Sequence, residues 1–366
     1  MRERIKVLFL IQVPPPFHGA SLRNYELYES IKKRNEFKTE LIGVSLAETV
    51  DELAAFSFKK VFISLGVFFK LFGKLLFFKP KIVFFSFSPN GWAFLRDVFY
   101  SFVLKFSSAK KIFIIREQVN FRKFKKSLLK FILKGVKVIS LSKNNKKMLK
   151  ENGIEDIIII NDRLKLVINE ESLSKRRQNN PPTILFLSNL SKEKGVYVFI
   201  EALMILKNKG DDFKAEIVGA PLNITEEELK ERISGLNLND RVTYHGFAKG
   251  MKRFEFYLKS DIFVLPSLKE TFPGVVLEAM QCALPVVSTK EGGIPDIIID
   301  GETGFLVEKG NPSALAEKIE VLLKDKNLAK KMGEKGRERF LKNFTFNKIE
   351  EEFVKLFSSL VENNEN

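Results

Sequence analysis

Short apolar runs alternate with longer segments of helical periodicity along most of the chain. Each run is rich in Val, Ile, Leu or Phe and ends at turn residues, which is typical of a β-strand. The segments between the runs place apolar residues at helical spacing, as at 22–34 and 196–207. This alternation predicts an α/β protein built from Rossmann-like units. The expected strands are 5–13, 82–87, 111–115, 136–142, 157–160, 183–187, 215–220, 242–246 and 261–265.

A polar segment at 169–182 divides this pattern into two halves. It ends in Asn-Asn-Pro-Pro, which is typical of an interdomain linker. We therefore expect an N-terminal domain at 1–168 and a C-terminal domain at 183–345. Two helices rich in Lys and Glu should finish the chain, and the last, at 346–366, could cross back to the N-terminal domain. A length of 366 residues suits two domains, and a composition with 45% hydrophobic residues excludes disorder as the main state.

The net charge of +16 is concentrated in one half of the chain. Residues 1–180 contain 35 Lys and Arg against 16 Asp and Glu, whereas the remainder contains 26 against 29. The N-terminal half should therefore attract an anionic partner such as lipid, polyphosphate or nucleic acid. Nucleic acid is not the expected partner, because no recognition motif accompanies the charge.

Two segments of the N-terminal half combine this basic charge with aromatic residues. No acidic residue occurs from Leu53 to Arg96, and a second basic segment follows Asn120. In both, phenylalanines at helical spacing lie on a different face from the lysines. Such helices either pack their aromatic face into the core or lie in a membrane interface. We expect core packing for most of the phenylalanines and docking on anionic lipid for part of the surface.

The first apolar run is interpreted as a strand and not as a secretory leader. Pro14 ends the run soon after Arg2, Arg4 and Lys6, and no small-residue cleavage site follows. No stretch reaches about 18 uninterrupted apolar residues, so no transmembrane helix is expected. We expect a cytoplasmic protein, peripheral on the inner face of the plasma membrane.

Metal chemistry is not expected. The single cysteine, Cys282, excludes a disulfide framework and a thiolate metal site. The chain has two histidines, and it lacks the Asp-x-Asp motif that would hold a nucleotide-bound divalent ion. We therefore expect a metal-independent protein without a cofactor.

The stretch 265–287, LPSLKETFPGVVLEAMQCALPVV, contains the main candidate site. It predicts a strand, a loop, a helix and a second strand, with Glu270 in the loop and Glu278 about one helical turn into the helix. A helix N-terminus offers free N–H groups and partial positive charge, which suit a diphosphate. Carboxylates accept hydrogen bonds from sugar hydroxyls. The combination favours a nucleotide-sugar site.

This stretch resembles the E-x7-E signature of the family 4 retaining glycosyltransferases, because PSLKE, a glycine, LEAM and PVV follow in the family order. The resemblance implies the GT-B fold, an α/β architecture of two Rossmann-like domains facing across a cleft. It also implies that Glu270 holds hydroxyls of the donor sugar, that Glu278 holds the ribose and that loop amides bind the diphosphate. The donor-binding residues implied here are Glu270, Thr271, Phe272, Pro273, Gly274, Val275 and Glu278.

A second loop, at 188–195, resembles the family sequence Gly-Arg-Leu followed by Lys-Gly. Lys194 and Gly195 match the family, whereas Asn189 replaces the arginine. The resemblance places Asn189, Lys194 and Gly195 at the donor. A lysine beside exposed amides can neutralise a leaving diphosphate, so Lys194 and Glu270 are the expected catalytic residues. The turn Gly292-Gly293 before a further helix is also similar to the family.

The N-terminal loops resemble the family less closely. Pro14-Pro15-Pro16 through Gly19 is similar to the PPP-x-x-G loop that faces the donor, and Gly19 would let the backbone approach the ligand. His18 either orients acceptor or phosphate or has only a structural role. Many relatives carry His-Gly after the strand 111–115, where this chain has Arg116-Glu117, and an arginine there can still bind phosphate. The residues expected on the acceptor or phosphate side are His18, Ser21, Arg96, Arg116 and Glu117.

The implied function is that of a retaining hexosyltransferase. It would transfer a sugar from a nucleotide-diphosphate sugar, with UDP favoured over GDP, to a lipid-linked or cell-surface polysaccharide acceptor such as lipopolysaccharide. A sugar-nucleotide epimerase of the same fold is one alternative. A hydrolase would need a second carboxylate beside Glu270. A non-catalytic basic protein that binds membrane or RNA is the remaining alternative.

Overall fold

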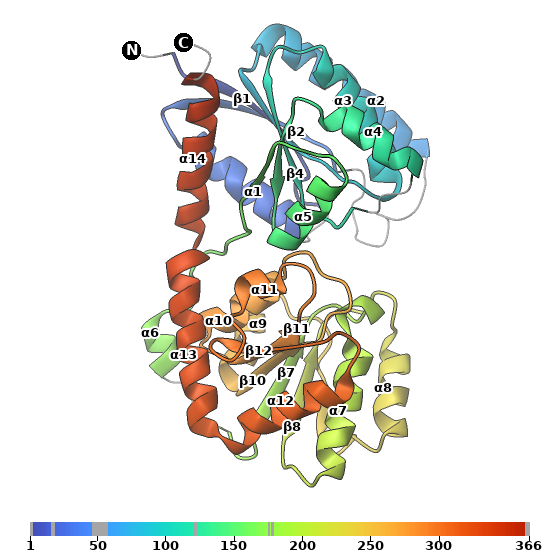
Figure 1. Ribbon diagram of the computed structural model, residues 1–366, viewed down its shortest axis with the longest axis vertical. Helices are drawn as coiled ribbons and strands as arrows, with labels where there is room; N and C mark the ends of the chain where they lie inside the picture. Colours follow the sequence, from blue (N-terminus) through green and yellow to red (C-terminus); the bar gives the residue numbers. More distant parts are fainter. Residues whose placement is uncertain are drawn as a thin grey trace. The chain divides into compact units, whose positions relative to one another are not determined.

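The computed structural model divides the chain into two compact units (Figure 1). It describes residues 3–15, 19–45, 58–119, 123–174, 176 and 179–362. Unit 1 comprises Met1–Asp162 and Asn347–Asn366, and unit 2 comprises Arg163–Phe346. Each unit contains one six-stranded parallel sheet with helices, so the predicted α/β class with two Rossmann-like units is confirmed.

The sheet of unit 1 has the strand order β2-β1-β3-β4-β5-β6. Every residue of β3 is buried, as expected for a parallel strand covered on both faces. Strand β2 was not expected from the sequence, because Lys38, Thr39 and Glu40 interrupt its apolar pattern. The strands are β1 Ile5–Ile11, β2 Phe37–Gly43, β3 Ile82–Ser86, β4 Lys110–Ile115, β5 Lys137–Ser140 and β6 Ile157–Ile159.

Helices cover both faces of this sheet. On one face, the C-terminal helix α14 places Phe353 against Phe84 and Phe357 against Phe9 and Phe37, with ring centroids 5.5–6.1 Å apart. Phe353 and Phe357 are both fully buried. The helices are α1 Gly19–Lys32, α2 Phe58–Gly73, α3 Gly91–Lys105, α4 Lys123–Leu133, α5 Lys143–Glu151 and α14 Phe346–Glu362, with a π-helical turn at Lys74–Phe78 after α2.

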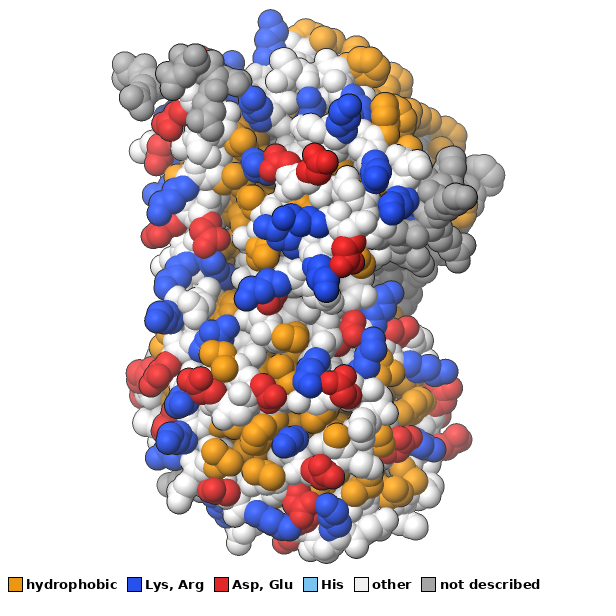
Figure 2. Space-filling view, in the orientation of Figure 1, with side chains coloured by type: hydrophobic (Ala, Val, Ile, Leu, Met, Phe, Trp, Pro, Cys, Tyr) orange, Lys and Arg blue, Asp and Glu red, His pale blue; other side chains and the backbone are white. Residues whose placement is uncertain are grey.

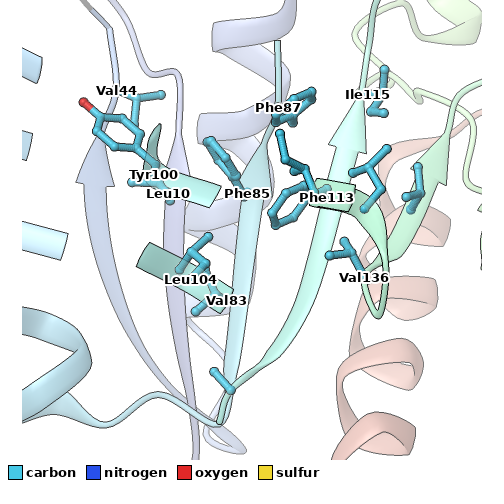
Figure 3. Close-up of a cluster of buried hydrophobic side chains, with 14 of the residues drawn as sticks. Leu10, Val44, Val83, Phe85, Phe87, Tyr100, Leu104, Phe113, Ile115 and Val136 are labelled. Atoms are coloured by element: carbon cyan, nitrogen blue, oxygen red, sulfur yellow. The ribbon is translucent and has the colours of Figure 1, made fainter. Parts of the chain in front are cut away.

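The other face of the sheet packs against α2, α3 and α4. Phe85 and Phe113 of neighbouring strands belong to the same buried cluster as the α3 residues Tyr100 and Leu104 (Figure 3). Val67 and Leu71 of α2 belong to the same buried cluster. One side of each helix is therefore committed to the core. The expectation that most phenylalanines of these helices pack into the core was wrong, because Phe62, Phe69, Phe72, Phe77 and Phe131 are exposed.

Helix α2 and the π-helical turn together also have the length and composition of a membrane-spanning helix. Within the described part of the chain, Lys60–Phe78 is the one helical stretch long and apolar enough to cross a membrane by length and composition. The sequence did not predict it, because Lys70 and Lys74 interrupt the apolar residues. Only 17% of this stretch is buried in the structure.

The sheet of unit 2 has the strand order β12-β11-β10-β7-β8-β9. The chain adds β8 and β9 on one side of β7 and then β10, β11 and β12 on the other. Ligands of such sheets bind at the carboxyl ends of the strands where the order reverses, which here is between β7 and β10. The strands are β7 Thr183–Leu187, β8 Lys214–Val218, β9 Val242–Tyr244, β10 Ile262–Leu265, β11 Val286–Thr289 and β12 Gly304–Val307.

The helices of unit 2 include part of the segment expected to be a linker. Helix α6 lies in that segment, and the side chain of Gln281 accepts hydrogen bonds from Val167 N and Ile168 N just before it. The expectation of two final helices was wrong. Three helices cover 312–362, because Asp325 ends α12 and its side chain caps α13. The helices are α6 Glu170–Ser174, α7 Val196–Asn208, α8 Glu226–Gly235, α9 Met251–Lys259, α10 Gly274–Gln281, α11 Ile294–Ile297, α12 Pro312–Lys324 and α13 Lys326–Asn343, with a 3₁₀ turn at Lys192–Lys194.

Candidate donor site

Two loops of unit 2 meet at the point where the strand order reverses. One follows β7 and runs through Ser188–Gly195, and the other follows β10 and runs through 266–273. The amides of Leu268 and Lys269 donate to the carbonyl of Glu193, at 2.8 and 3.2 Å. These hydrogen bonds hold the second loop against the 3₁₀ turn of the first.

Two glycines allow this close approach. Gly195 has a φ of +76°, and a Cβ atom there would lie 2.0 Å from the carbonyl oxygen of Pro266. Gly292 has a φ of +57°, and its Cβ would lie 1.9 Å from the carbonyl oxygen of Glu270. Any larger residue would push the loops apart. Gly293 N adds a 2.8 Å hydrogen bond to Thr271 O.

The loops bring Lys194 and Glu270 into direct contact. Lys194 Nζ lies 2.5 Å from Glu270 Oε2, although the residues are 76 positions apart. The carboxylate is mostly buried and the ammonium group is more accessible. The Ser191 hydroxyl accepts a hydrogen bond from Lys194 N, and Glu270 Oε1 accepts one from Thr271 N at 3.0 Å. A cation and a carboxylate are therefore fixed at the carboxyl edge of the sheet.

Helix α10 begins directly after this pair. Its N-terminus follows Pro273, which provides no side-chain cap, so the first amides are not satisfied by a capping side chain. Gly274 and Val275 are half-buried, whereas Phe272 and Pro273 are buried. The exposed Asn189 lies in the neighbouring loop. The backbone groups expected to bind a diphosphate thus follow closely in sequence after Glu270, which contacts Lys194.

Glu278 lies in a separate buried cluster within unit 2. Its Oε1 is 2.7 Å from a guanidinium nitrogen of Arg253, and its Oε2 accepts a 3.1 Å hydrogen bond from Tyr257. Burial, with Glu278 beside it, raises the pKa of Tyr257 well above its usual range. Arg253 and Tyr257 were not expected from the sequence. Their spacing of four positions on α9 places them on one helix face and could have identified them as a pair.

In unit 1, Arg116 is held by neighbours. It forms an ion pair with Asp162, and its Nε donates to Asn24 Oδ1 at 3.1 Å. The Asn24 amide in turn donates to Ser86 Oγ at 3.1 Å. This buried network links α1, β3 and the end of β4. The phosphate-binding role of Arg116 stays a prediction, and any anion would have to compete with Asp162.

Arg96 and Glu117, also expected on the acceptor side, have partners of their own. The guanidinium of Arg96 is 2.6 Å from the buried Asp97 and donates to Val44 O at 2.5 Å. Burial raises the pKa of Asp97, and Arg96 opposes this shift. Glu117 is exposed and accepts from Asn90 at 3.0 Å. Of the remaining acceptor-side residues, Ser21 is buried and His18 lies outside the described residues. Gly19, which was expected at the donor, begins α1 and is exposed.

The described residues contain no group of three or more His, Cys, Asp or Glu side chains that could hold a metal ion. Cys282 is buried at the end of α10, and burial raises the pKa of its thiol to about 12. The thiol is therefore protonated at neutral pH. The candidate chemistry of unit 2 consists of one ammonium group, backbone amides and carboxylates.

Comparison with solved structures defines the fold as that of the GT-B glycosyltransferases. Over 98% of its length, the chain matches 99% of a glycosyltransferase from Rickettsia africae with a TM-score of 0.79 and 24% identity. Over 97% of its length, it matches the whole of the Anabaena protein HepE, solved with UDP, with a TM-score of 0.75 and 20% identity. HepE has also been solved with UDP-glucose.

The sequence of unit 2 carries a family signature. Residues 167–339, just under half of the chain, match the family model of the glycosyl transferases group 1. The capsular polysaccharide biosynthesis glycosyltransferase CapM of Staphylococcus aureus is 30% identical over 187 residues, which cover 51% of this chain and 48% of CapM. The chain spans about half the length of the curated relatives it matches. The candidate site lies wholly inside the matched region.

Proposed function

We propose that this chain is a retaining glycosyltransferase of family 4 that takes its sugar from a nucleotide-diphosphate sugar. The observation that carries the proposal is the contact between Lys194 and Glu270, where the loops after β7 and β10 meet. This position lies at the strand-order reversal and directly before the N-terminus of α10. The matched family and the GT-B fold support the same assignment.

The proposed chemistry is mainly electrostatic. Breaking the anomeric C–O bond gives the sugar oxocarbenium character and leaves negative charge on the departing diphosphate. Lys194 and the backbone N–H groups in the stretch from Phe272 to Val275, where Pro273 has none, would stabilise that charge. Glu270 would accept hydrogen bonds from sugar hydroxyls, and Glu278 from the ribose. A diphosphate would displace Glu270 from part of its contact with Lys194, so that the carboxylate becomes available to the sugar.

We favour UDP as the nucleotide, and a lipid-linked or cell-surface polysaccharide as the acceptor. HepE, with the same fold, binds UDP and UDP-glucose, and CapM acts in capsular polysaccharide biosynthesis. The strongly basic N-terminal half supports a location on the cytoplasmic face of a membrane. The chemistry outlined above requires no metal ion or cofactor, so EDTA should leave turnover unchanged.

The donor is tested first by thermal shift with UDP, GDP and their sugars. The preferred nucleotide should raise the melting temperature, since a ligand at about 100 times its Kd stabilises the folded state by about 2.7 kcal/mol. Lys194→Ala should remove most of this shift. Lys209→Ala is the matched control, because Lys209 forms a similar 2.6 Å pair with Glu320 at the far end of α7. An equal shift in the wild type and in Lys194→Ala would contradict the assignment of the donor site.

Transfer is then measured with the preferred donor and a lipid-linked acceptor. Lys194→Ala and Glu270→Gln should each lower kcat by about 100-fold or more, the size of effect seen when a transition-state charge loses one donor. The product should keep the anomeric configuration of the donor. An epimerase would convert the donor without acceptor, and a hydrolase would release free sugar. A non-catalytic protein would bind its partner equally well in all variants.

A further inference from the structure

Most of the exposed large hydrophobic side chains in the described part of the chain lie on one surface of unit 1. Thirteen of twenty-one belong to α2, α3, α4 and the residues directly following α2 and α3. Figure 2 shows hydrophobic side chains gathered over these helices. A protein surface rarely exposes such a patch unless a partner covers it. We name it the aromatic face, formed by Val61, Phe62, Leu65, Phe69, Phe72, Leu76, Phe77, Trp92, Leu95, Phe99, Phe102, Phe106 and Phe131.

The aromatic face is continuous across the three helices. Phe69 contacts Phe68, and Phe68 stacks on Phe99 of α3 with ring centroids 4.8 Å apart. Phe102 of α3 lies 5.6 Å from Phe131 of α4. Ring contacts therefore join neighbouring helices into one layer. Its most exposed members are at the ends of α2 and α3, where Phe77 is 87% exposed and Phe106 is 91% exposed.

Helix α2 is anchored and cannot leave the unit to span a bilayer without breaking the core. Val67, Leu71 and Phe78 are buried in the cluster shared with the sheet. The hydroxyl of Tyr100 donates to Ser64 O at 3.0 Å and ties α3 to α2. The exposed side of α2 therefore suits a position along a membrane surface, with its opposite side kept in unit 1.

Lysines accompany the aromatic face. From residue 53 to residue 150, the only acidic residues are Asp97, which is buried, and Glu117. A groove of about 620 Å³ opens beside the end of the π-helical turn and the end of α3. We name it the lysine groove, lined by Lys79, Lys81, Lys110, Ser107, Ser108 and apolar residues that include Leu75, Leu76 and Leu360.

The charge in the lysine groove is not neutralised within the described chain. No carboxylate among the described residues lies within ion-pair distance of Lys79, Lys81 or Lys110. Neighbouring lysines also repel one another, since burial and Lys134 lower the pKa of Lys105, and burial with Lys105 and Lys110 lowers that of Lys111. A bound phosphate would relieve this repulsion.

We propose that the aromatic face and the lysine groove dock unit 1 on a bilayer that contains anionic phospholipid. The aromatic side chains would enter the boundary between headgroups and acyl chains, while the groove binds headgroup phosphates. A second copy of the chain is the less suitable occupant, because it would bring lysines opposite lysines. The inference rests on the proposed function only for the membrane location, because the docking residues lie in unit 1 and the donor residues lie in unit 2.

The test uses the full chain and the fluorescence of Trp92, which is the single tryptophan and belongs to the aromatic face. Vesicles of phosphatidylcholine with an equal amount of phosphatidylglycerol should shift its emission to shorter wavelength, and vesicles of phosphatidylcholine alone should not. Flotation then measures binding. The pair Phe77→Ser with Phe106→Ser, and the pair Lys79→Gln with Lys81→Gln, should each reduce the partition coefficient at least tenfold. Added salt should weaken binding, because surface charges are screened.

Matched controls come from exposed residues of unit 2. Leu222→Ser with Val321→Ser, and Lys214→Gln with Lys331→Gln, should bind vesicles like the wild type. Equal binding by all variants, or equal binding to both kinds of vesicle, would overturn the proposal. The proposal would also be overturned if the wild type formed a soluble dimer that does not bind vesicles and that dissociates in the variant with Phe77→Ser and Phe106→Ser. The thermal shift caused by UDP is measured in every variant. If the shift is retained while vesicle binding does not change as expected, the docking proposal fails and the donor-site proposal stands.

Discussion

At the scale of single residues, Gly195 should be indispensable for bringing the two donor loops together. Gly195→Ala would add left-handed strain of about 1–2 kcal/mol and a clash with Pro266 O. We expect unfolding in urea to show a loss of at least about 3 kcal/mol, with loss of nucleotide binding. Gly210→Ala is the control, since Gly210 has a φ of +85° but no atom within 4 Å of the added Cβ. Equal losses in the two variants would show that the clash is absent.

Cys282 should make the stability of unit 2 decline in alkali. An exposed thiol has a pKa of about 8.5, whereas burial raises the pKa of Cys282 to about 12. The folded state keeps a proton that the unfolded state has lost, so the stability present below pH 8.5 declines as the pH rises toward 12. Between pH 8 and pH 10 the wild type should lose about 2 kcal/mol through this group.

The measurement is urea unfolding at both pH values for the wild type and for Cys282→Ala. The alanine variant should lose about 2 kcal/mol less between them. Burial is the main cause that raises the pKa of Tyr257, so this group stays protonated in the folded state of both proteins between pH 8 and pH 10. Identical pH dependence in the two proteins would mean that the thiol ionises freely in the folded state.

The sequence predicted that Lys194 and Glu270 lie in one site, because both occur in recognisable loops, but it did not predict their contact at 2.5 Å. It did not predict the neighbours of Glu278. Arg253 and Tyr257 reach that carboxylate through the packing of α9 on α10, which local sequence pattern does not encode. The ion pair of Arg116 with Asp162 has the same origin, since 46 positions separate the partners.

At the scale of elements, the continuously apolar strands were predictable because parallel strands are buried on both faces. Strand β2 lies at the edge of its sheet, where Lys38 and Glu40 can reach solvent, so its pattern resembles that of a loop. The break between α12 and α13 was missed for a different reason. A single aspartate, Asp325, serves as the C-cap of one helix and the N-cap of the next.

The side chain of Gln281, the last residue of α10, should hold in place the segment that precedes α6. Gln281→Met keeps the size of this fully buried side chain but leaves Val167 N and Ile168 N without their acceptor. Two unsatisfied amides should lower the free energy of unfolding by about 2–4 kcal/mol. Urea unfolding measures the loss, and hydrogen exchange at the two amides should accelerate. A loss below about 0.5 kcal/mol would indicate that the segment finds other partners.

At the scale of the whole molecule, two stretches distant in sequence build unit 1. Phe357→Ala would leave a cavity among Phe9, Phe37 and Phe84, and it should destabilise unit 1 by about 3–5 kcal/mol. Calorimetry should show a lower transition for unit 1 and an unchanged UDP-stabilised transition for unit 2. Phe77→Ala, at an exposed position in the same unit, serves as the control. A shift of both transitions together would mean that the units unfold as one.

The return of the chain to unit 1 also sets an order for its synthesis. Residues 163–346 form an uninterrupted unit, whereas the sheet of unit 1 lacks the cover of α14 until residues 346–362 have left the ribosome. Folding during translation proceeds domain by domain. Unit 2 can therefore fold before Phe9 and Phe84 make their contacts with α14, so that apolar surface of the N-terminal half stays exposed for longer.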